Sequence, residues 1–246
     1  MDVDLINELK EELDRCRPLP SAALRNLDEV FRVEWTYNSN AIEGNTLSLL
    51  ETKLVLEQGL AIGGKKLREH FEVINHSEAI SYVQDIVHRN IELTEHVIKS
   101  VHQLVLKTID DANAGRYRTV NVFISGSQHT PPHYTLVQEQ MEQLLQWYEE
   151  HKDILHPVNL AAEFHFKFVY IHPFSDGNGR TARLLMNLIL MKHGYPPAIV
   201  KAASEARLNY YESLEEASMN GNLDPFLHLI AGCVQDSLQR YIAVVK

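Results

Sequence analysis

The chain is organised around one segment, HPFSDGNGRTAR, which occupies residues 172–183. It follows an apolar helical pattern and leads into the apolar run at residues 184–191, which predicts a buried helix. A glycine-rich turn at the start of a helix brings free backbone N–H groups and the positive end of the helix dipole together. Such a helix N-terminus suits a phosphate. The segment therefore predicts a polyphosphate site with a histidine base beside it.

The first half of the segment supplies a base and a carboxylate. His172 precedes Pro173, which biases it away from the helix and into the loop. It could deprotonate a hydroxyl nucleophile, and the alternative is a histidine that only caps the helix. Asp176 lies beside Gly177, where an aspartate can simply form a turn. A lone carboxylate next to phosphate oxygens is also a usual way to hold Mg²⁺.

The second half of the segment is suited to an anion. Gly177 and Gly179 permit positive φ angles and a close approach of backbone to ligand. Asn178 could bind a phosphate oxygen or stabilise the turn, and both alternatives stay open. Arg180 and Arg183 are spaced i, i+3 at a helix start, where the dipole disfavours cations unless an anion neutralises them. The alternative is that acidic neighbours pair with both arginines.

These twelve residues resemble, position for position, the HxFx(D/E)GNGRxxR signature of the Fic family. The resemblance implies an all-α Fic-type core and a protein adenylyltransferase, which transfers AMP from ATP to a Ser, Thr or Tyr hydroxyl of a target protein and releases pyrophosphate. It implies that His172 is the catalytic base and that Asp176 is the Mg²⁺ ligand. The residues that it implies for binding ATP phosphates are Gly177, Asn178, Gly179, Arg180 and Arg183.

A second motif lies far upstream, at residues 39–44, and reads SNAIEG. By itself it predicts a helix end and a turn with a surface carboxylate. It resembles the inhibitory pattern (S/T)xxxE(G/N) of the family, with Ser39, Glu43 and Gly44 at the defined positions. The resemblance implies that Glu43 pairs with Arg183 and occupies the place of the γ-phosphate. Glu43 could also align a water molecule for removal of AMP from a target.

Two further segments resemble parts of the family site. Residues 116–134 interrupt the helical pattern: residues 119–124 are rich in β-branched residues and the two prolines at 131–132 forbid helix, which favours a short β-hairpin or an extended flap. The part from 118 to 134 resembles the target-docking flap of the family, and the alternative is an ordinary hairpin that covers the core. In this flap, Val122 and Ile124 are expected to face inward, whereas His129 and Thr130 could meet a target. Nearer the C-terminus, Asn209 and Tyr210 resemble the segment that closes the adenine pocket. Tyr210 could equally pack in the core.

Helical periodicity covers most of the chain and predicts helices near 21–38, 66–89, 94–109, 204–219 and 224–243. Capping boxes at Ser48 and Thr135 predict two more helix starts. Pro157 favours a helix start, and Gly194 favours the end of the helix after the signature. We expect three parts: an N-terminal helical region with the inhibitory motif at 1–92, a Fic catalytic core at 93–220 and a C-terminal helix at 221–246.

Composition restricts the class of protein. The formal net charge of −10 over 246 residues argues against nonspecific binding to nucleic acid or to an anionic membrane. The acidic start and the two cysteines favour a cytoplasmic protein without a signal peptide. The expected partners are ATP and a target protein, which could be a second copy of this chain in a homo-oligomer. The alternatives to protein adenylylation are removal of AMP, transfer of another nucleotide, and nucleotide sensing without turnover.

Overall fold

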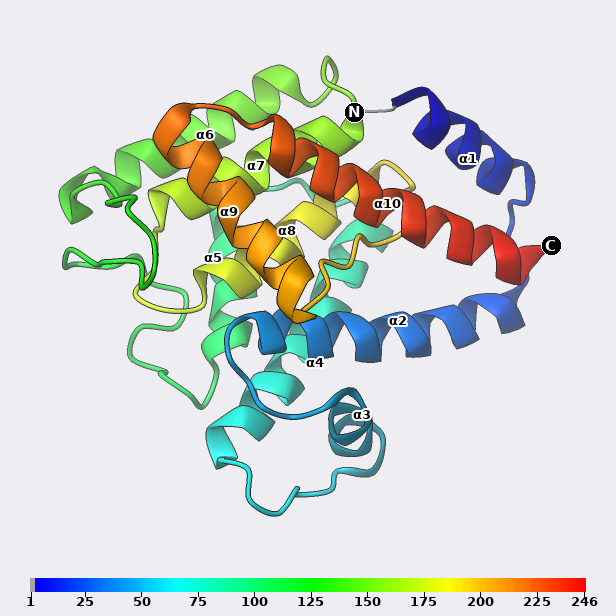
Figure 1. Ribbon diagram of the computed structural model, residues 1–246, viewed down its shortest axis with the longest axis horizontal. Coiled ribbons are helices and arrows are strands. Elements are labelled where there is room, and N and C mark those ends of the chain that lie inside the picture. The colour runs from blue at the N-terminus through cyan, green and yellow to red at the C-terminus, as the bar shows by residue number, and fades with distance from the viewer. Residues whose placement is uncertain (1–2) are drawn as a thin grey trace.

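The structure, a computed structural model, describes residues 3–246 apart from the side chains of residues 21–24. The N-terminal residues Met1 and Asp2 lie outside this range. The described part of the chain is built from α-helices and one 3-10 turn, so the all-α expectation is confirmed (Figure 1). The elements are α1 Val3–Arg15, α2 Ser21–Ile42, α3 Leu49–Gln58, α4 Leu67–His88, α5 Glu95–Leu106, η1 Tyr134–Leu136, α6 Val137–His151, α7 Pro157–Ile171, α8 Asn178–Lys192, α9 Ser204–Asn220 and α10 Asp224–Val245.

Helix α8 is the centre of the fold. Every residue from Arg180 to Leu190 is buried, and so is Asn178. A helix that is apolar nearly all round must be covered on all sides, and α2, α4, α5 and α7 all pack against it. Its N-terminus, which carries the glycines and arginines of the signature, is therefore held in a fixed place by four other helices.

Local capping explains most helix ends. Ser48 and Glu51 form the expected capping box at the start of α3, and Gly59 ends that helix in the left-handed region at φ 64°. Thr94 caps α5 through the N–H of Val97, as predicted. Each of these side chains satisfies a backbone group that the helix itself leaves unpaired.

Helix boundaries differ from the sequence prediction most informatively in two places. Helix α2 continues four residues past the predicted end, to Ile42, so that Ser39 lies inside the helix and Glu43 caps it. The predicted capping box at Thr135 is wrong. Thr135 lies in η1, its hydroxyl contacts His133, and α6 begins at Val137 without a side-chain cap.

The predicted β-hairpin is also wrong, since none of the residues described, 3–246, forms a strand. Side chains take the hydrogen bonds that cross-strand pairing would use. The Tyr134 N–H donates to the Asn121 side chain at 3.0 Å, and the Gln128 N–H donates to Glu215 of α9 at 2.6 Å. Pro131 and Pro132 have no N–H to donate. Residues 116–134, called the flap below, are therefore an irregular loop tied to α9.

The flap side chains divide into buried and exposed groups. Val122 and Ile124 are half-buried, and Phe123 between them is 87% exposed. Thr130 is exposed, in line with the sequence analysis. His129 is not: its ring packs on Tyr170 at 4.1 Å and bonds the carbonyl of that residue at 2.9 Å. The ring of His129 therefore holds the flap to α7, and its contact with a target stays a prediction.

No helix within residues 3–246 combines the length and the apolar character needed to cross a membrane.

Buried histidines should make the stability of this fold depend on pH. Burial is the main cause that lowers the pKa of His76 and His165 well below the ordinary value and that of His102 to about 4. The unfolded chain binds protons near pH 6.5, whereas the folded chain does not. The free energy of unfolding should therefore fall as pH drops below 6.5, by roughly 2 kcal/mol per histidine at pH 5.

Urea unfolding at pH 8, 6.5 and 5 measures this loss. The variant His76→Gln, which has no group to protonate, should show a shallower pH dependence than the unmodified chain. A free energy of unfolding that is constant across this range would contradict the expectation.

Candidate functional site

The site begins where α7 ends. His172 caps the helix in the left-handed region, at φ 52° and ψ 59°, which is a strained conformation for a residue other than glycine. Its ring nitrogen Nδ1 lies 3.3 Å from the carbonyl oxygen of Val169. A proton on Nδ1 for this contact leaves Nε2 as an acceptor. The site therefore presents a ring nitrogen able to take a proton.

The surroundings of His172 keep the imidazole neutral. Burial lowers its pKa to about 4, with smaller lowering effects from Arg118 and His129 and opposing effects from the Val169 carbonyl and Glu43. A neutral imidazole at neutral pH is the form that a general base requires.

The loop after His172 is closed by internal contacts. Phe174 is fully buried and stacks on the ring of His102 at 3.5 Å. The side-chain amide of Asn178 accepts from the Phe174 N–H at 2.9 Å and donates to its carbonyl at 2.8 Å. This contact decides between the two alternatives for Asn178. Its side chain stabilises the turn, and only its backbone N–H is left for an anion.

His102 fixes the same loop from α5. Its Nδ1 accepts from the Gly115 N–H and its Nε2 donates to the Asp176 carbonyl, both at 2.9 Å. The sequence analysis missed this role, and the one available signal was a histidine on an otherwise apolar helix face. A neutral His102 thus holds the backbone of Asp176 while Phe174 stacks on its ring.

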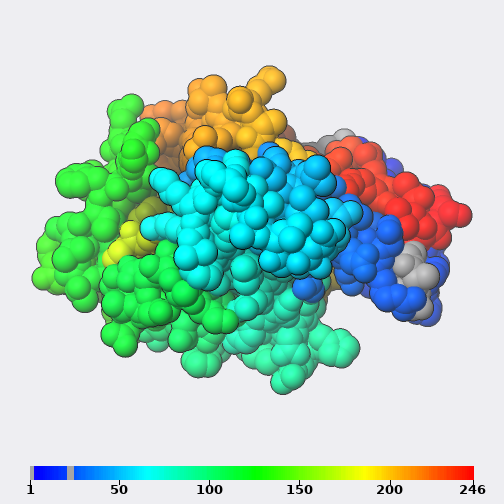
Figure 2. Space-filling view, turned by 90° about the horizontal axis from the view of Figure 1, so that it is seen from below, coloured from blue at the N-terminus to red at the C-terminus, as the bar shows by residue number. Residues whose placement is uncertain are grey.

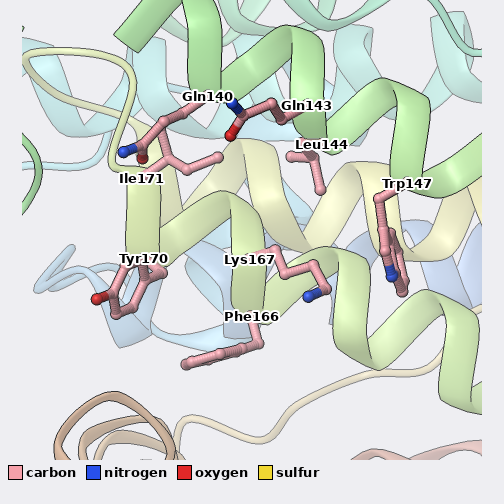
Figure 3. Close-up of a pocket in the computed structure, with 8 residues that line it drawn as sticks. All are labelled: Gln140, Gln143, Leu144, Trp147, Phe166, Lys167, Tyr170 and Ile171. Atoms are coloured by element: carbon pink, nitrogen blue, oxygen red, sulfur yellow. The ribbon is translucent and has the colours of Figure 1, made fainter. Parts of the chain in front are cut away.

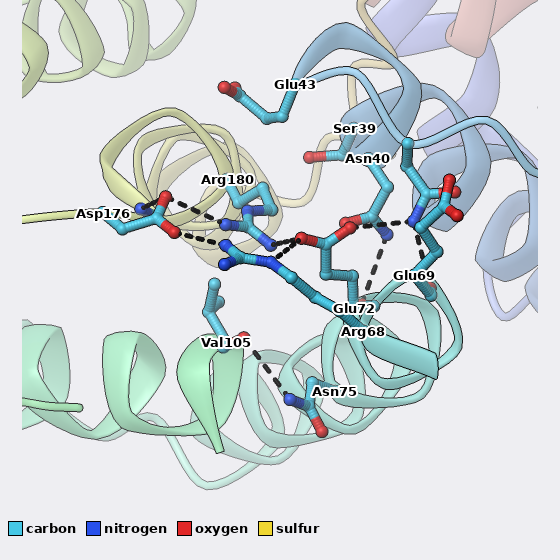
Figure 4. A network of polar contacts seen from close by, with 12 residues as sticks. Ser39, Asn40, Glu43, Arg68, Glu69, Glu72, Asn75, Val105, Asp176 and Arg180 are labelled. Atoms are coloured by element: carbon cyan, nitrogen blue, oxygen red, sulfur yellow. Dashed lines mark hydrogen bonds and ion pairs between the residues drawn. The ribbon is translucent and has the colours of Figure 1, made fainter. Parts of the chain in front are cut away.

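The Asp176 carboxylate faces two arginines (Figure 4). One oxygen accepts from Arg180 at 3.2 Å and the other from Arg68 of α4 at 2.6 Å. Glu72 lies across both guanidinium groups, 3.1 Å from Arg68 and 3.5 Å from Arg180. Burial raises the pKa of Asp176, but Arg180, the Gly177 N–H and Arg68 outweigh it and lower that pKa. The carboxylate is therefore ionised at neutral pH.

Arg180 pairs with the acidic residues Asp176 and Glu72, as the alternative from the sequence predicted, but these contacts do not use all of its donors. The residue is 2% exposed, its Nη1 faces the Glu72 carboxylate at 3.5 Å, and its Nε makes no hydrogen bond within the described chain. A buried guanidinium with unused donors retains the capacity to bind an anion. Sequence spacing did not reveal Arg68 or Glu72, because both come from α4, more than 100 residues upstream.

Arg183 is fully engaged. It is 2% exposed and donates to the Ser39 hydroxyl at 3.0 Å, the Ser39 carbonyl at 2.8 Å, the Tyr210 hydroxyl at 3.2 Å and the Glu43 carboxylate at 2.7 Å. Burial acts to lower its pKa, but Tyr210 and Glu43 outweigh that effect and raise it. The structure thus brings Ser39 and Glu43 onto the arginine that the sequence resemblance paired with Glu43.

The Glu43 carboxylate lies directly over the start of α8. A Cβ atom on Gly179 would stand 2.2 Å from a Glu43 oxygen and 3.1 Å from Arg183 Nη1. Gly179 is therefore required for close approach of an anion and not for a positive φ. Gly177 and Gly44 do adopt positive φ, at 75° and 97°, where they form the turn before α8 and the turn after α2. The anion that the sequence predicted at this helix N-terminus is, in this structure, the carboxylate of Glu43.

Asn209 and Tyr210, which resemble the segment that closes the adenine pocket, lie in different environments. Tyr210 is buried, its hydroxyl bonds His165 at 3.0 Å, and its ring contacts Phe226, so no face is left for a purine. The ATP-binding assignment of Tyr210 is replaced by support of Arg183. Asn209 is exposed on α9. Tyr211, whose ring lies 5.4 Å from that of Tyr210, donates to the Ile42 carbonyl and is 41% exposed.

Of the carboxylates in this site, Asp176 is the one that precedes the N-terminus of α8 and could hold a metal ion. The described residues hold no cluster of three metal-capable side chains, which excludes a closed protein cage there. Mg²⁺ bound to phosphates needs only one or two carboxylates because phosphate oxygens and water complete its shell. Asp176, which is ionised and 44% exposed at its side chain, fits that requirement.

The site opens to the surface between the flap and the start of α4. Seen from below, yellow atoms of the signature region are visible between green atoms and the cyan atoms of α3 and the start of α4 (Figure 2). A separate groove of about 390 Å³ lies between α6 and α7 and ends at Ile171, beside His172 (Figure 3). The groove is lined by Gln140, Gln143, Leu144, Trp147, Phe166, Lys167, Tyr170 and Ile171.

Comparison with known proteins gives a consistent result. The Fic/DOC family model matches residues 92–190. Protein adenylyltransferase Fic from Nematostella vectensis is 38% identical over 99% of this chain and 57% of its own length. Protein adenylyltransferase fic-1 from Caenorhabditis elegans is also 38% identical, over 98% of this chain and 47% of its own length. The chain thus spans about half the length of these curated relatives.

Solved structures extend the match. A structure of Fic-1 from C. elegans aligns with a TM-score of 0.87 and 38% identity, covering 98% of this chain and 72% of that chain. A Fic domain containing signaling protein from Bacteroides thetaiotaomicron aligns with a TM-score of 0.89 and 30% identity, covering 98% and 96%. With the signature geometry described above, these matches show that the chain belongs to the Fic/DOC family.

Proposed function

We propose that this protein is a protein adenylyltransferase that its own Glu43 holds inactive. The observation that carries the proposal is the Glu43 carboxylate, which lies over Gly179 and on Arg183, where a helix N-terminus and a buried guanidinium suit a phosphate. The names of the relatives from N. vectensis and C. elegans support the activity.

In the proposed reaction, Nε2 of His172 takes the proton of a target hydroxyl. The hydroxyl oxygen forms a bond to the α-phosphorus of ATP, the bond from that phosphorus to the bridging oxygen breaks, and pyrophosphate leaves. Arg183, released from Glu43, and the buried Arg180, whose Nε has no partner, would stabilise the negative charge on the phosphates. The first N–H groups of α8 have no acceptor within the helix and would bind the phosphates as well.

Asp176 would hold Mg²⁺ against the phosphates, which neutralises part of their charge. At rest both of its oxygens accept from arginines. Oδ1 also accepts from the Gly177 N–H, whereas Oδ2 accepts only from Arg68, so Oδ2 keeps a lone pair that could bind the metal.

The flap would receive the target. Its backbone is not paired into a sheet, and Phe123 is the most exposed large apolar residue on it. An extended target segment could pair with such a backbone. In the resting state, Glu43 thus occupies the phosphate site, while the flap beside it is exposed and could dock a target.

Glu43→Gly should activate the enzyme. The variant loses a charge-assisted hydrogen bond to Arg183, worth about 1.5–3 kcal/mol, so ATP should bind productively about 10- to 100-fold more readily. Incubation with fluorescent ATP and a cell lysate, followed by mass spectrometry, measures labelling and identifies the target. Glu34→Gly on the same helix is the control, because Glu34 pairs with Arg240 and not with the site. Equal labelling by both variants would refute the inhibitory role.

His172→Ala in the Glu43→Gly background should abolish transfer while ATP still binds. Because the pKa of His172 is about 4, the acid limb of the activity profile should lie well below pH 6.5. Calorimetry for ATP binding and initial rates from pH 5 to 8 test both points. Undiminished function in His172→Ala would favour the nucleotide-sensing alternative.

Asp176→Asn in the Glu43→Gly background should remove the effect of Mg²⁺ on nucleotide binding. The amide carries no charge for the metal, so added Mg²⁺ should no longer strengthen ATP binding or raise the melting temperature. Calorimetry and thermal unfolding with Mg²⁺ or with EDTA provide the measurement. A full Mg²⁺ effect in the variant would exclude Asp176 as a ligand.

A further inference from the structure

Arg118 is a buried cation that bonds only to backbone carbonyls. It is 4% exposed, and its Nε donates to the His172 carbonyl at 2.9 Å. Its Nη1 donates to Val120 at 3.0 Å, and its Nη2 donates to Pro132 at 2.5 Å and Ile171 at 3.5 Å. The Arg118 backbone N–H adds a bond to the Pro173 carbonyl at 2.9 Å.

The acceptors explain why a cation is tolerated there. Burial lowers the pKa of Arg118, because removal from water disfavours the charged guanidinium. The Ile171 and His172 carbonyls are the last ones of α7, where helix carbonyls lack partners and the dipole is negative. The guanidinium satisfies these carbonyls and gains from the dipole.

The same group also ties the two ends of the flap. Val120 and Pro132 flank the projecting part of the flap, which includes the exposed Phe123. Since no strand pairing holds the flap, one planar guanidinium joins both of its ends to the last turn of α7. That turn carries the strained backbone of His172.

We propose that Arg118 is a positioning residue that fixes the target-docking flap and the base His172 relative to each other. This inference rests on the proposed function, which makes the flap a docking segment and His172 a base. The connection between the flap and His172 through Arg118 is a property of the fold. A target docked on the flap would then present its hydroxyl at a set distance from the His172 ring. Lysine cannot replace this residue, because one ammonium group does not span the four carbonyls as a planar fork does.

The kinetic test uses Arg118→Lys in the Glu43→Gly background. Misplacement of the hydroxyl and the base by about 1 Å should lower kcat for self-labelling with fluorescent ATP by about 10²-fold. ATP affinity should stay within about twofold, since Arg118 makes no contact with the phosphate-binding residues. Arg240→Lys is the matched control: it breaks the paired bonds to Glu34 far from the flap and should leave kcat unchanged. An unchanged kcat in Arg118→Lys would overturn the proposal.

A second test does not depend on transfer activity. Hydrogen exchange of residues 119–134 and the ring NMR signals of His172 are followed in the otherwise unmodified chain. Arg118→Lys should speed exchange in the flap and shift the His172 signals together, whereas Arg240→Lys should do neither. Faster flap exchange with unchanged His172 signals would show that the two are not coupled and would overturn the proposal.

If Arg118→Lys does not fold, a second variant that loosens the flap at Asn121 still tests the proposal. Asn121→Ala removes the 3.0 Å bond to the Tyr134 N–H without touching Arg118. The His172 ring signals should shift in this variant too, and their constancy would count against coupling. Inactive Glu43→Gly protein would refute the proposed function alone, because the exchange and NMR measurements would still decide the role of Arg118.

Discussion

A buried guanidinium at the start of a buried helix requires an anion, and the rest of the site follows from this requirement. Arg183 lies where the dipole of α8 disfavours a cation and where water does not reach. Leaving such a charge without a partner costs about 3–5 kcal/mol. Glu43 meets the requirement at rest, with the Ser39 and Tyr210 oxygens completing the shell. In the proposed reaction, a phosphate takes the place of Glu43.

In the proposed function, this exchange of anions would make inhibition and substrate binding share residues. The carboxylate is held by the end of α2, and Gly44 turns the chain away directly after it. The side chain of Glu43 is one-third exposed, whereas that of Arg183 is almost fully buried. The exposed partner is the one that can swing out, because water can solvate it. The fixed partner stays in place and keeps its charge for the nucleotide.

The sequence predicted which residues gather at the start of α8 better than it predicted the contacts that hold them in place. The spacing of Arg180 and Arg183 at a helix start predicted a bound anion, and the all-α fold followed from periodicity. The contacts made by His102, Arg118 and Arg68 could not be predicted, since each joins segments 54 or more residues apart. The β-hairpin failed for a related reason. Local β-propensity was overridden when side chains of Asn121 and Glu215 took the backbone N–H groups.

The supporting contacts also separate what is rigid from what can move. Helix α8 is packed on all sides, and His102 with Asn178 fixes the loop before it through buried, neutral hydrogen bonds. By contrast, the ion pair between Asp176 and Arg68 joins two substantially exposed side chains, and a pair of this kind contributes little stability. An ion or a phosphate can therefore rearrange the charged groups at small cost while the backbone that presents them stays fixed. Under the proposed function, a rigid frame with replaceable ionic partners would let the same residues hold the resting state and receive the substrate.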